Sequence, residues 1–264
     1  MELLDDFFNT KSYQFKLLVL ISINIFLLNS LRISSFDQII NLLISFAVYS
    51  FCKKNNFDEE KNINLFQVLL ALIFLIFILY RSLWLHIGDN FIYLFFPFSL
   101  IILFLQCNNI NNQEINIKPI LISLLFPISK IIFIPLAIIV NPFSTFFTWI
   151  VLNALGFYSV MKGQEIFYNS SGINVTFTCS GAGQIIFCLT AMVIFNVFFP
   201  LKSKRLLLIQ MFRSILVTFF ANVVRLFLLT IFVGTANIDG FSIFQYFHGG
   251  NGGLLFSFFS MLIS

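Results

Sequence analysis

The stretch 206–233, LLLIQMFRSILVTFFANVVRLFLLTIFV, decides the class of fold. A helix needs about 20 residues to cross about 30 Å of hydrocarbon, and this stretch is long enough with few charges. The rest of the chain agrees, because 59% of the 264 residues are hydrophobic, only 10% are charged and the mean hydropathy is +0.97. A soluble globular protein of this size cannot bury so much apolar surface. The sequence therefore predicts an all-α polytopic membrane protein.

Apolar runs recur along the whole chain, and each is a candidate span. They lie at 15–31, 36–52, 64–83, 91–107, 119–140, 143–161, 181–200, 206–233 and 249–264. Basic residues that mark cytoplasmic loops by the positive-inside rule are Lys53, Lys54 and Lys61, then Lys118, and then Lys202, Lys204 and Arg205. These three loops should share one side of the membrane.

Because these loops share one side, the chain crosses the membrane an even number of times between any two of them. Three apolar runs lie between Lys118 and Lys202, but the number of crossings there must be even. We expect 143–161, which follows Asn141-Pro142, to lie in the outer interface as a separate helix. This gives about eight transmembrane helices, both termini in the cytoplasm and 141–180 outside. Lys130, between two prolines of the fifth span, indicates a broken or locally wet helix.

The segment 162–178, KGQEIFYNSSGINVTFT, has a different pattern. Two short runs with partial alternation, Glu165 to Tyr168 and Ile173 to Phe177, flank the turn sequence Asn-Ser-Ser-Gly. This arrangement predicts a short β-hairpin on the outer face, directly before Cys179.

Charge and cysteine content exclude several other classes. The net charge of +4 comes from scattered residues, without the basic block of a nucleic-acid arm, so no nucleic-acid partner is expected. The four cysteines lack metal-ligand spacing, so neither a disulfide framework nor a metal site is predicted, and no cofactor is expected. The first apolar run has no small-residue cleavage site and indicates a retained anchor.

A first polar signal is Cys179, at the start of the sixth span in Cys-Ser-Gly-Ala-Gly-Gln. The positive end of a helix dipole and free N–H groups there would activate a thiol and could hold an oxyanion, and the small neighbours leave room for a peptide. The competing interpretation is an ordinary buried cysteine in a packed helix. Cys188 follows nine residues later, on the opposite helical face, and is expected to serve packing.

A second signal is Arg225 in the seventh span. Ser214, Thr218, Asn222 and Arg225 recur at steps of four, four and three, which places them on one helical face. Placing an arginine in a membrane helix costs free energy. Such a residue therefore either has a functional role or extends its side chain to the lipid headgroups. Counted from the cytoplasmic basic residues, Arg225 and Cys179 both lie about 30 Å away, near the outer surface.

A third signal is His248, in FQYFHGGNGGLLF just before the last span. The predicted topology puts its loop outside, as it does for the second histidine, His86, beside Asp89. A lone loop histidine is usually solvated. However, a thiol, an imidazole and a guanidinium at one membrane face provide a nucleophile, a base and a charge stabiliser for acyl transfer.

The order C-S-G, then N-x-x-R, then F-H-x-x-x-G resembles the exosortase/archaeosortase family of integral-membrane cysteine proteases or transpeptidases. FHGGNGG is most similar to its cyanobacterial branch. The resemblance covers about 140 to 264 and includes Gly163 to Ile166 before the cysteine; residues 1–140 agree only in being membrane helices. Gly181-Ala182-Gly183-Gln184 departs from the usual G-[LI]-[RN]-S.

The resemblance implies that Cys179 is the nucleophile, His248 the general base and acid, and Arg225 an essential positive group. Asn222 would orient Arg225, and Ser180 of the C-S-G motif would support the site. The implied substrates are exported proteins whose C-terminal sorting tail has a short PEP-like motif, a hydrophobic helix and a basic end.

Cleavage would occur at the outer face of the bacterial plasma (inner) membrane. Residues 1–264 would form a single integral-membrane domain, with N-terminal helices in 1–140 and the catalytic half in 141–264. Two other functions stay open. One is a transporter in which Arg225 binds an anionic solute, and the other is a membrane acyltransferase that uses His248 without a thiol nucleophile.

Overall fold

The computed structural model divides the chain into two compact units, Met1–Ile128 and Ser129–Ser264. The second unit contains every residue that the sequence singled out for chemistry. The residues that the structure describes are 13–30, 35–54, 73, 75–80, 89–105, 113–169, 171–201, 203–234, 244–248 and 250–263. His86 and Cys107 lie outside them, as does most of the apolar run 64–83.

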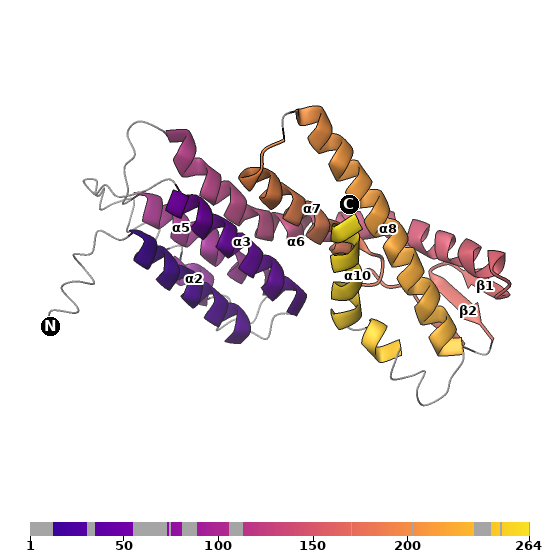
Figure 1. Ribbon diagram of the computed structural model, residues 1–264. Helices are drawn as coiled ribbons and strands as arrows, with labels where there is room; N and C mark the ends of the chain where they lie inside the picture. The colour runs from indigo at the N-terminus through magenta and orange to yellow at the C-terminus, as the bar shows by residue number, and fades with distance from the viewer. Residues whose placement is uncertain are drawn as a thin grey trace. The chain divides into compact units, whose positions relative to one another are not determined.

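The first unit is helical where it is described (Figure 1). Its elements are α2 (Tyr13–Ser30), α3 (Ser35–Lys54), the 3₁₀ helix η1 (Asp89–Leu94), α5 (Phe95–Leu105) and the beginning of α6 (Gln113–Ala154). α2 packs against both α3 and α5. The buried amide of Asn24 donates a hydrogen bond of 3.1 Å to the side chain of Asn41, which joins α2 to α3 as polar residues do between membrane helices.

The second unit combines helices with a small sheet. After the end of α6 come β1 (Ser159–Lys162), β2 (Glu165–Tyr168), β3 (Ser171–Asn174), α7 (Ala182–Phe198), α8 (Lys204–Gly234) and α10 (Gly250–Ile263). The last three helices pack against one another, and β2 and β3 pack on α8. The core between the sheet and α8 is formed by Leu152, Ile166, Ile173, Val175, Cys179, Leu226 and Leu229.

α6 is one continuous helix of 42 residues, so the expectation of a separate interfacial helix at 143–161 is wrong. The expected break at Pro127, Lys130 and Pro135 is absent as well, because the helix runs through all three. A membrane helix tolerates proline because its surroundings satisfy the freed backbone groups. The side chain of Asn141, which precedes the expected interfacial helix, donates to the carbonyl of Val175 at 2.9 Å, a contact made from within α6.

Because α6 is continuous, the apolar run 119–140 and most of the run 143–161 form one helix instead of two. α6 and α7 are now the two helices between Lys118 and Lys202, the even number that the positive-inside rule requires. Among the described residues, two helical stretches are long and apolar enough to cross a membrane, Lys118–Ala154 and Lys204–Gly234, and five apolar helices are shorter. A total of eight crossings therefore stays a prediction.

A hairpin is present before Cys179, and it belongs to a three-stranded antiparallel sheet of order β1-β2-β3. Its second strand is Ser171–Asn174 and not the expected 173–177, because the last two residues of the expected Asn-Ser-Ser-Gly turn already pair with β2. β1 was not expected, because its residues fall at the end of an apolar run. Both hairpins have two-residue turns, and the first residue of each turn has positive φ: Gly163 at 62° and Asn169 at 54°. Such turns match the twist of paired strands and favour glycine and asparagine.

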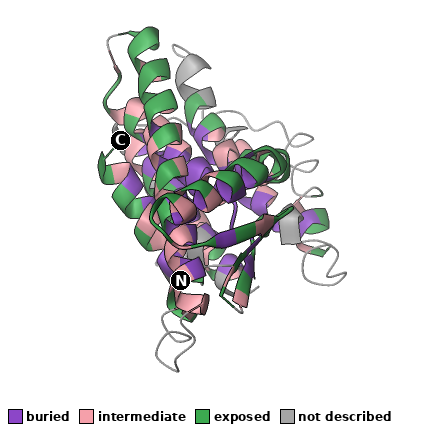
Figure 2. Ribbon diagram, turned by 90° about the vertical axis from the view of Figure 1, so that its right-hand side faces the viewer, coloured by how far each residue is buried: buried purple, intermediate pink, exposed green. Residues whose placement is uncertain are grey.

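Apolar side chains face outward along the spanning helices. On α8, Leu208, Phe212 and Phe220 are 66%, 63% and 51% exposed, whereas Leu226 is 1% exposed on the inner face. Figure 2 shows the same pattern, with exposed residues along the outer faces of the helices and buried residues between them. Large apolar side chains on an outer helix face suit contact with lipid.

Candidate active site

The segment that carries Cys179 is a tight turn between β3 and α7. Cys179 is 4% exposed, its N–H donates to the carbonyl of Thr176 at 2.9 Å, and the N–H of Ser180 donates to the carbonyl of Phe177 at 3.4 Å. α7 begins at Ala182, so the cysteine precedes the helix and is not part of its first turn. The N–H groups of Cys179 and Ser180 bond within the turn, and the expectation that free N–H groups at the start of the helix hold an oxyanion stays a prediction.

Three side chains from two helices hold this turn by its carbonyls. From α6, Asn141 donates to Val175 O, and Ser144 donates to Ser180 O at 2.8 Å. From α8, Asn222 donates to Cys179 O at 3.1 Å. All three side chains are fully buried, where an unpaired polar group would be costly, so the contacts strongly favour one position of the turn.

Ser180 and Gly181 complete the turn. The Ser180 hydroxyl donates to Phe177 O at 2.7 Å and accepts from the N–H of Ala182 at 3.2 Å, which connects the turn to the start of α7. Gly181 has φ of 88°, and a Cβ there would lie 2.8 Å from the amide of Asn222. Both the backbone conformation and the close approach of Asn222 therefore require glycine at this position.

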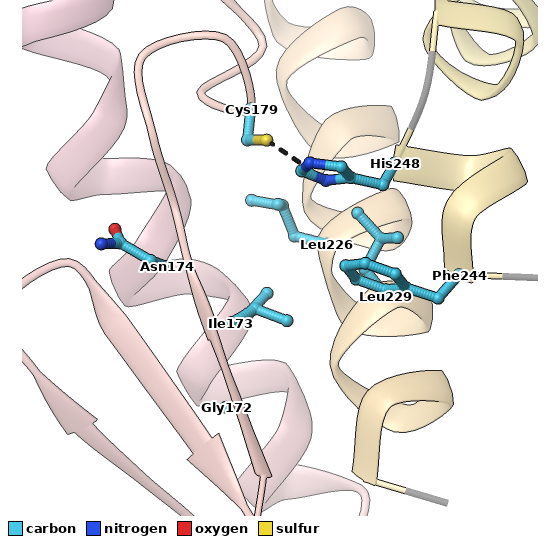
Figure 3. Close-up of a pocket in the computed structure, with 8 residues that line it drawn as sticks. All are labelled: Gly172, Ile173, Asn174, Cys179, Leu226, Leu229, Phe244 and His248. Atoms are coloured by element: carbon cyan, nitrogen blue, oxygen red, sulfur yellow. Dashed lines mark hydrogen bonds between the residues drawn. The ribbon is translucent and has the colours of Figure 1, made fainter. Parts of the chain in front are cut away.

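His248 brings an imidazole to the thiol. It belongs to a helical turn at 244–248, and its Nδ1 lies 3.7 Å from Sγ of Cys179, the contact drawn as a dashed line in Figure 3. The ring stacks on Phe244 with centroids 5.1 Å apart and planes 9° apart. The stacking restricts the imidazole to the plane in which Nδ1 reaches the sulfur.

The pKa of His248 is lowered below its ordinary value of 6.5, first by partial burial and then by the positive charge of Arg225. The imidazole is therefore neutral at neutral pH and can accept a proton.

Arg225 holds the backbone of the histidine segment. Its Nε donates to Phe247 O at 3.0 Å, and its Nη2 donates to His248 O at 3.3 Å. Its Nη1 donates to Oδ1 of Asn222 at 3.4 Å, and the amide of Asn222 holds Cys179 O. α8 thus connects the two segments that carry the thiol and the imidazole. Asn222 was expected to orient Arg225, and the structure shows this contact.

A cavity of about 140 Å³ opens beside the thiol and the imidazole (Figure 3). Its lining residues come from β3, the cysteine turn, α8 and the histidine turn: Gly172, Ile173, Asn174, Cys179, Leu226, Leu229, Phe244 and His248. Arg225 is not among them. In the described part of the chain, no group of three or more His, Cys, Asp or Glu residues could hold a metal ion.

Cys188 lies away from this cavity. It is 2% exposed, and its thiol donates to the carbonyl of Ser257 in α10 at 3.6 Å. Gln184, in the stretch that departs from the common family pattern, also contacts α10 by donating to Gly253 O at 3.3 Å.

Asn141 and Ser144 support the site although no role was expected for their side chains. Two polar residues three apart in an apolar run were the available signal.

The chain was also compared with known proteins. The model of the transmembrane exosortase family matches residues 34–264. The match extends well into the N-terminal helices, where the motif resemblance had covered only about 140 to 264. Comparisons with curated proteins and with solved structures find no match. Since the family model matches nearly the whole chain, this membrane protein belongs to the transmembrane exosortase family.

Proposed function

We propose that the protein is a cysteine protease or transpeptidase that processes the C-terminal sorting tails of exported proteins. The observation that supports this most directly is the 3.7 Å contact between the thiol of Cys179 and Nδ1 of His248 beside an open cavity. Family membership agrees with sorting-signal processing. The substrates would carry a short PEP-like motif, a hydrophobic helix and a basic end.

The proposed reaction is acyl transfer through a thioester. Cys179 Sγ attacks the carbonyl carbon of the scissile peptide bond while its proton passes to Nδ1 of His248. When the carbon–nitrogen bond breaks, the protonated imidazole gives that proton to the leaving amine of the tail. The thioester then reacts with water or with an acceptor amine, and the thiol is regenerated.

In this proposal Arg225 and Asn222 are positioning residues. They hold the carbonyls of Phe247, His248 and Cys179, and their hydrogen bonds fix the distance between base and nucleophile. This role differs from the direct stabilisation of an oxyanion or a substrate carboxylate that the isolated arginine suggested. Ser144 and Ser180 support the same arrangement from the other side of the cysteine turn.

The two other candidate functions agree less well with the contacts. A transporter that binds an anion through Arg225 needs that guanidinium to face a cavity, but three of its N–H groups contact protein oxygens and it does not line the cavity. An acyltransferase that relies on His248 alone leaves the thiol next to the imidazole without a function.

The test of the proposed function is the processing of an exported reporter protein that carries such a tail. We expect a shortened reporter in cells that make this chain, and loss of shortening when the thiol of Cys179 is removed. A reporter that keeps its tail in the presence of the intact chain would contradict the proposal.

The active site is proposed to lie on the outer face of the plasma membrane. A reporter enzyme that is active only outside the cytoplasm should be silent when fused at Ser203 and active when fused at Asn169 or near Asp239. Fusions of a reporter active only in the cytoplasm provide the control, with the opposite pattern. A cytoplasmic signal at Asn169 would place the cysteine turn on the wrong side of the membrane for an exported substrate.

The lowered pKa of His248 predicts the acid limb of the pH–rate profile. The base must be neutral, and a group with a lowered pKa stays neutral to lower pH, so the rate should fall only as pH drops through a midpoint below 6.5. The groups near the ring are Cys179 and Arg225, and Arg225 stays positive throughout this range. Initial cleavage rates of the solubilised protein between about pH 5 and pH 8 measure the midpoint. A midpoint above 6.5 would show that another group controls the rate.

A further inference from the structure

The edge of β3 lies at the active-site cavity, and its pairing can be worked out from the register. Hydrogen-bonded and non-hydrogen-bonded pairs alternate in an antiparallel ladder. Val175 N donates to Gln164 O at 2.9 Å, so the alternation makes Ile173, opposite Ile166, a hydrogen-bonded residue too.

The alternate residues of β3, Gly172 and Asn174, therefore belong to non-hydrogen-bonded pairs with β2. Gly172 and Asn174 therefore direct their backbone N–H and C=O groups away from β2, toward the free edge of the sheet. Among the described residues, no strand pairs with that edge. The carbonyl of Asn174 accepts from Thr176 N at 3.1 Å, which leaves the N–H of Asn174 and both polar groups of Gly172 to face the edge.

This edge lines the same cavity as the reacting groups. Gly172, Ile173 and Asn174 follow one another along one side of the cavity, and Cys179 lies further along it (Figure 3). Leu226, Leu229 and Phe244 contribute apolar surface from α8 and the histidine turn. An extended peptide at the edge would therefore find backbone partners on one side and an apolar surface beside it.

We propose that the substrate segment next to the scissile bond binds as an added strand on the free edge of β3. The inference rests on the proposed role of Cys179 as nucleophile and adds how the substrate is held. Backbone groups of every second substrate residue pair with Gly172 and Asn174. Because side chains alternate along a strand, every second side chain then faces the apolar surface of the cavity.

Strand addition explains how a membrane protease could accept tails of varied sequence. Main-chain hydrogen bonds are available from any residue except the N–H of proline, so most of the recognition would not depend on substrate side chains. It also presents the substrate carbonyls in an extended, defined register, as attack by a fixed thiol requires.

The test uses a tetrapeptide chloromethyl ketone, acetyl-Val-Ala-Val-Ala-CH₂Cl, and the full-length protein in detergent. The sulfur of Cys179 displaces chloride from the methylene carbon and forms a thioether, whose rate of formation is followed by mass spectrometry. In a series with one amide N-methylated at a time, we expect slowing by roughly threefold to tenfold at the one position whose N–H pairs with the carbonyl of Gly172 and little change at the others, as expected for the loss of a single hydrogen bond. Iodoacetamide, which has no peptide part, measures the reactivity of the thiol itself.

Variants at Asn174 provide the matched protein-side test. Asn174→Pro removes the N–H at the free edge, a position where an edge strand tolerates proline, and should slow the tetrapeptide reagent by roughly threefold to tenfold while leaving the iodoacetamide rate unchanged. Asn174→Ala keeps the N–H and removes only the side chain, so its rates measure the side-chain contribution, and the proline variant should react with the tetrapeptide reagent roughly threefold to tenfold more slowly than the alanine variant. Equal slowing at every N-methylated position or at none, or equal rates in the proline and alanine variants, would overturn strand addition alone. A Cys179 that reacts with neither reagent would overturn strand addition together with the proposed nucleophile.

Discussion

Cys179→Ala should abolish processing of the reporter, whereas Cys188→Ala should keep most of it. The two cysteines are nine residues apart and both buried, but only the Cys179 thiol lies within 3.7 Å of an imidazole and lines the cavity. The thiol of Cys188 donates to a helix carbonyl in α10, so its removal costs only packing. Removing a nucleophile that works with its base typically costs many orders of magnitude in rate, up to about 10⁶-fold.

Immunoblots of reporter size, with the amount of membrane-inserted enzyme measured in parallel, check this prediction. Cys179→Ser belongs in the same series and should be nearly inactive, because a hydroxyl is much harder to deprotonate than a thiol near neutral pH. Equal loss in the Cys179 and Cys188 alanine variants, at normal enzyme levels, would leave the nucleophile unassigned.

Arg225→Lys should lower cleavage by at least about tenfold while the amount of protein in the membrane stays normal. The planar guanidinium reaches the two adjacent carbonyls of Phe247 and His248 and the amide of Asn222 at once. An ammonium group keeps the charge but cannot reproduce this fork, so the histidine turn would lose its defined position. A displacement of about 1 Å at a reacting group can cost about 100-fold in rate, so tenfold is a conservative minimum.

A positioning role makes further measurements informative. The loss should appear in kcat more than in KM, because Arg225 does not line the cavity. The rate of Cys179 alkylation by iodoacetamide and the enzyme level control for misfolding. Near-normal cleavage in this variant would mean that the arginine only anchors α8 at the headgroups, since lysine reaches the same depth equally well.

The sequence predicted which residues meet, and the reason is topological. Cys179 and His248 lie just before apolar runs, and Arg225 lies about 30 Å along its run from the basic loop, so counting crossings and helix length assigned all three to one membrane face. The structure brings these residues together in one unit. The turn residues correctly predicted a hairpin before Cys179, but its second strand begins two residues earlier than expected, and β1 remained hidden in an apolar run.

The hydrogen-bond partners of those residues could not be predicted from the membrane topology. Arg225 and Asn222 donate to main-chain carbonyls, and every residue has a carbonyl, so no sequence pattern marks the acceptor. The break expected at Asn141-Pro142 failed for a related reason. Proline and asparagine end helices in water, but within α6 the asparagine side chain found its own buried acceptor in Val175.

The cysteine turn has a consequence for how family members can diverge. Asn141, Ser144 and Asn222 hold it through the carbonyls of Val175, Ser180 and Cys179, so the contacts do not depend on which side chains the turn carries. Its exposed residues 176–178 are therefore free to change over evolution without displacing the nucleophile. Selection on substrate preference can act on these positions separately from selection on the chemistry.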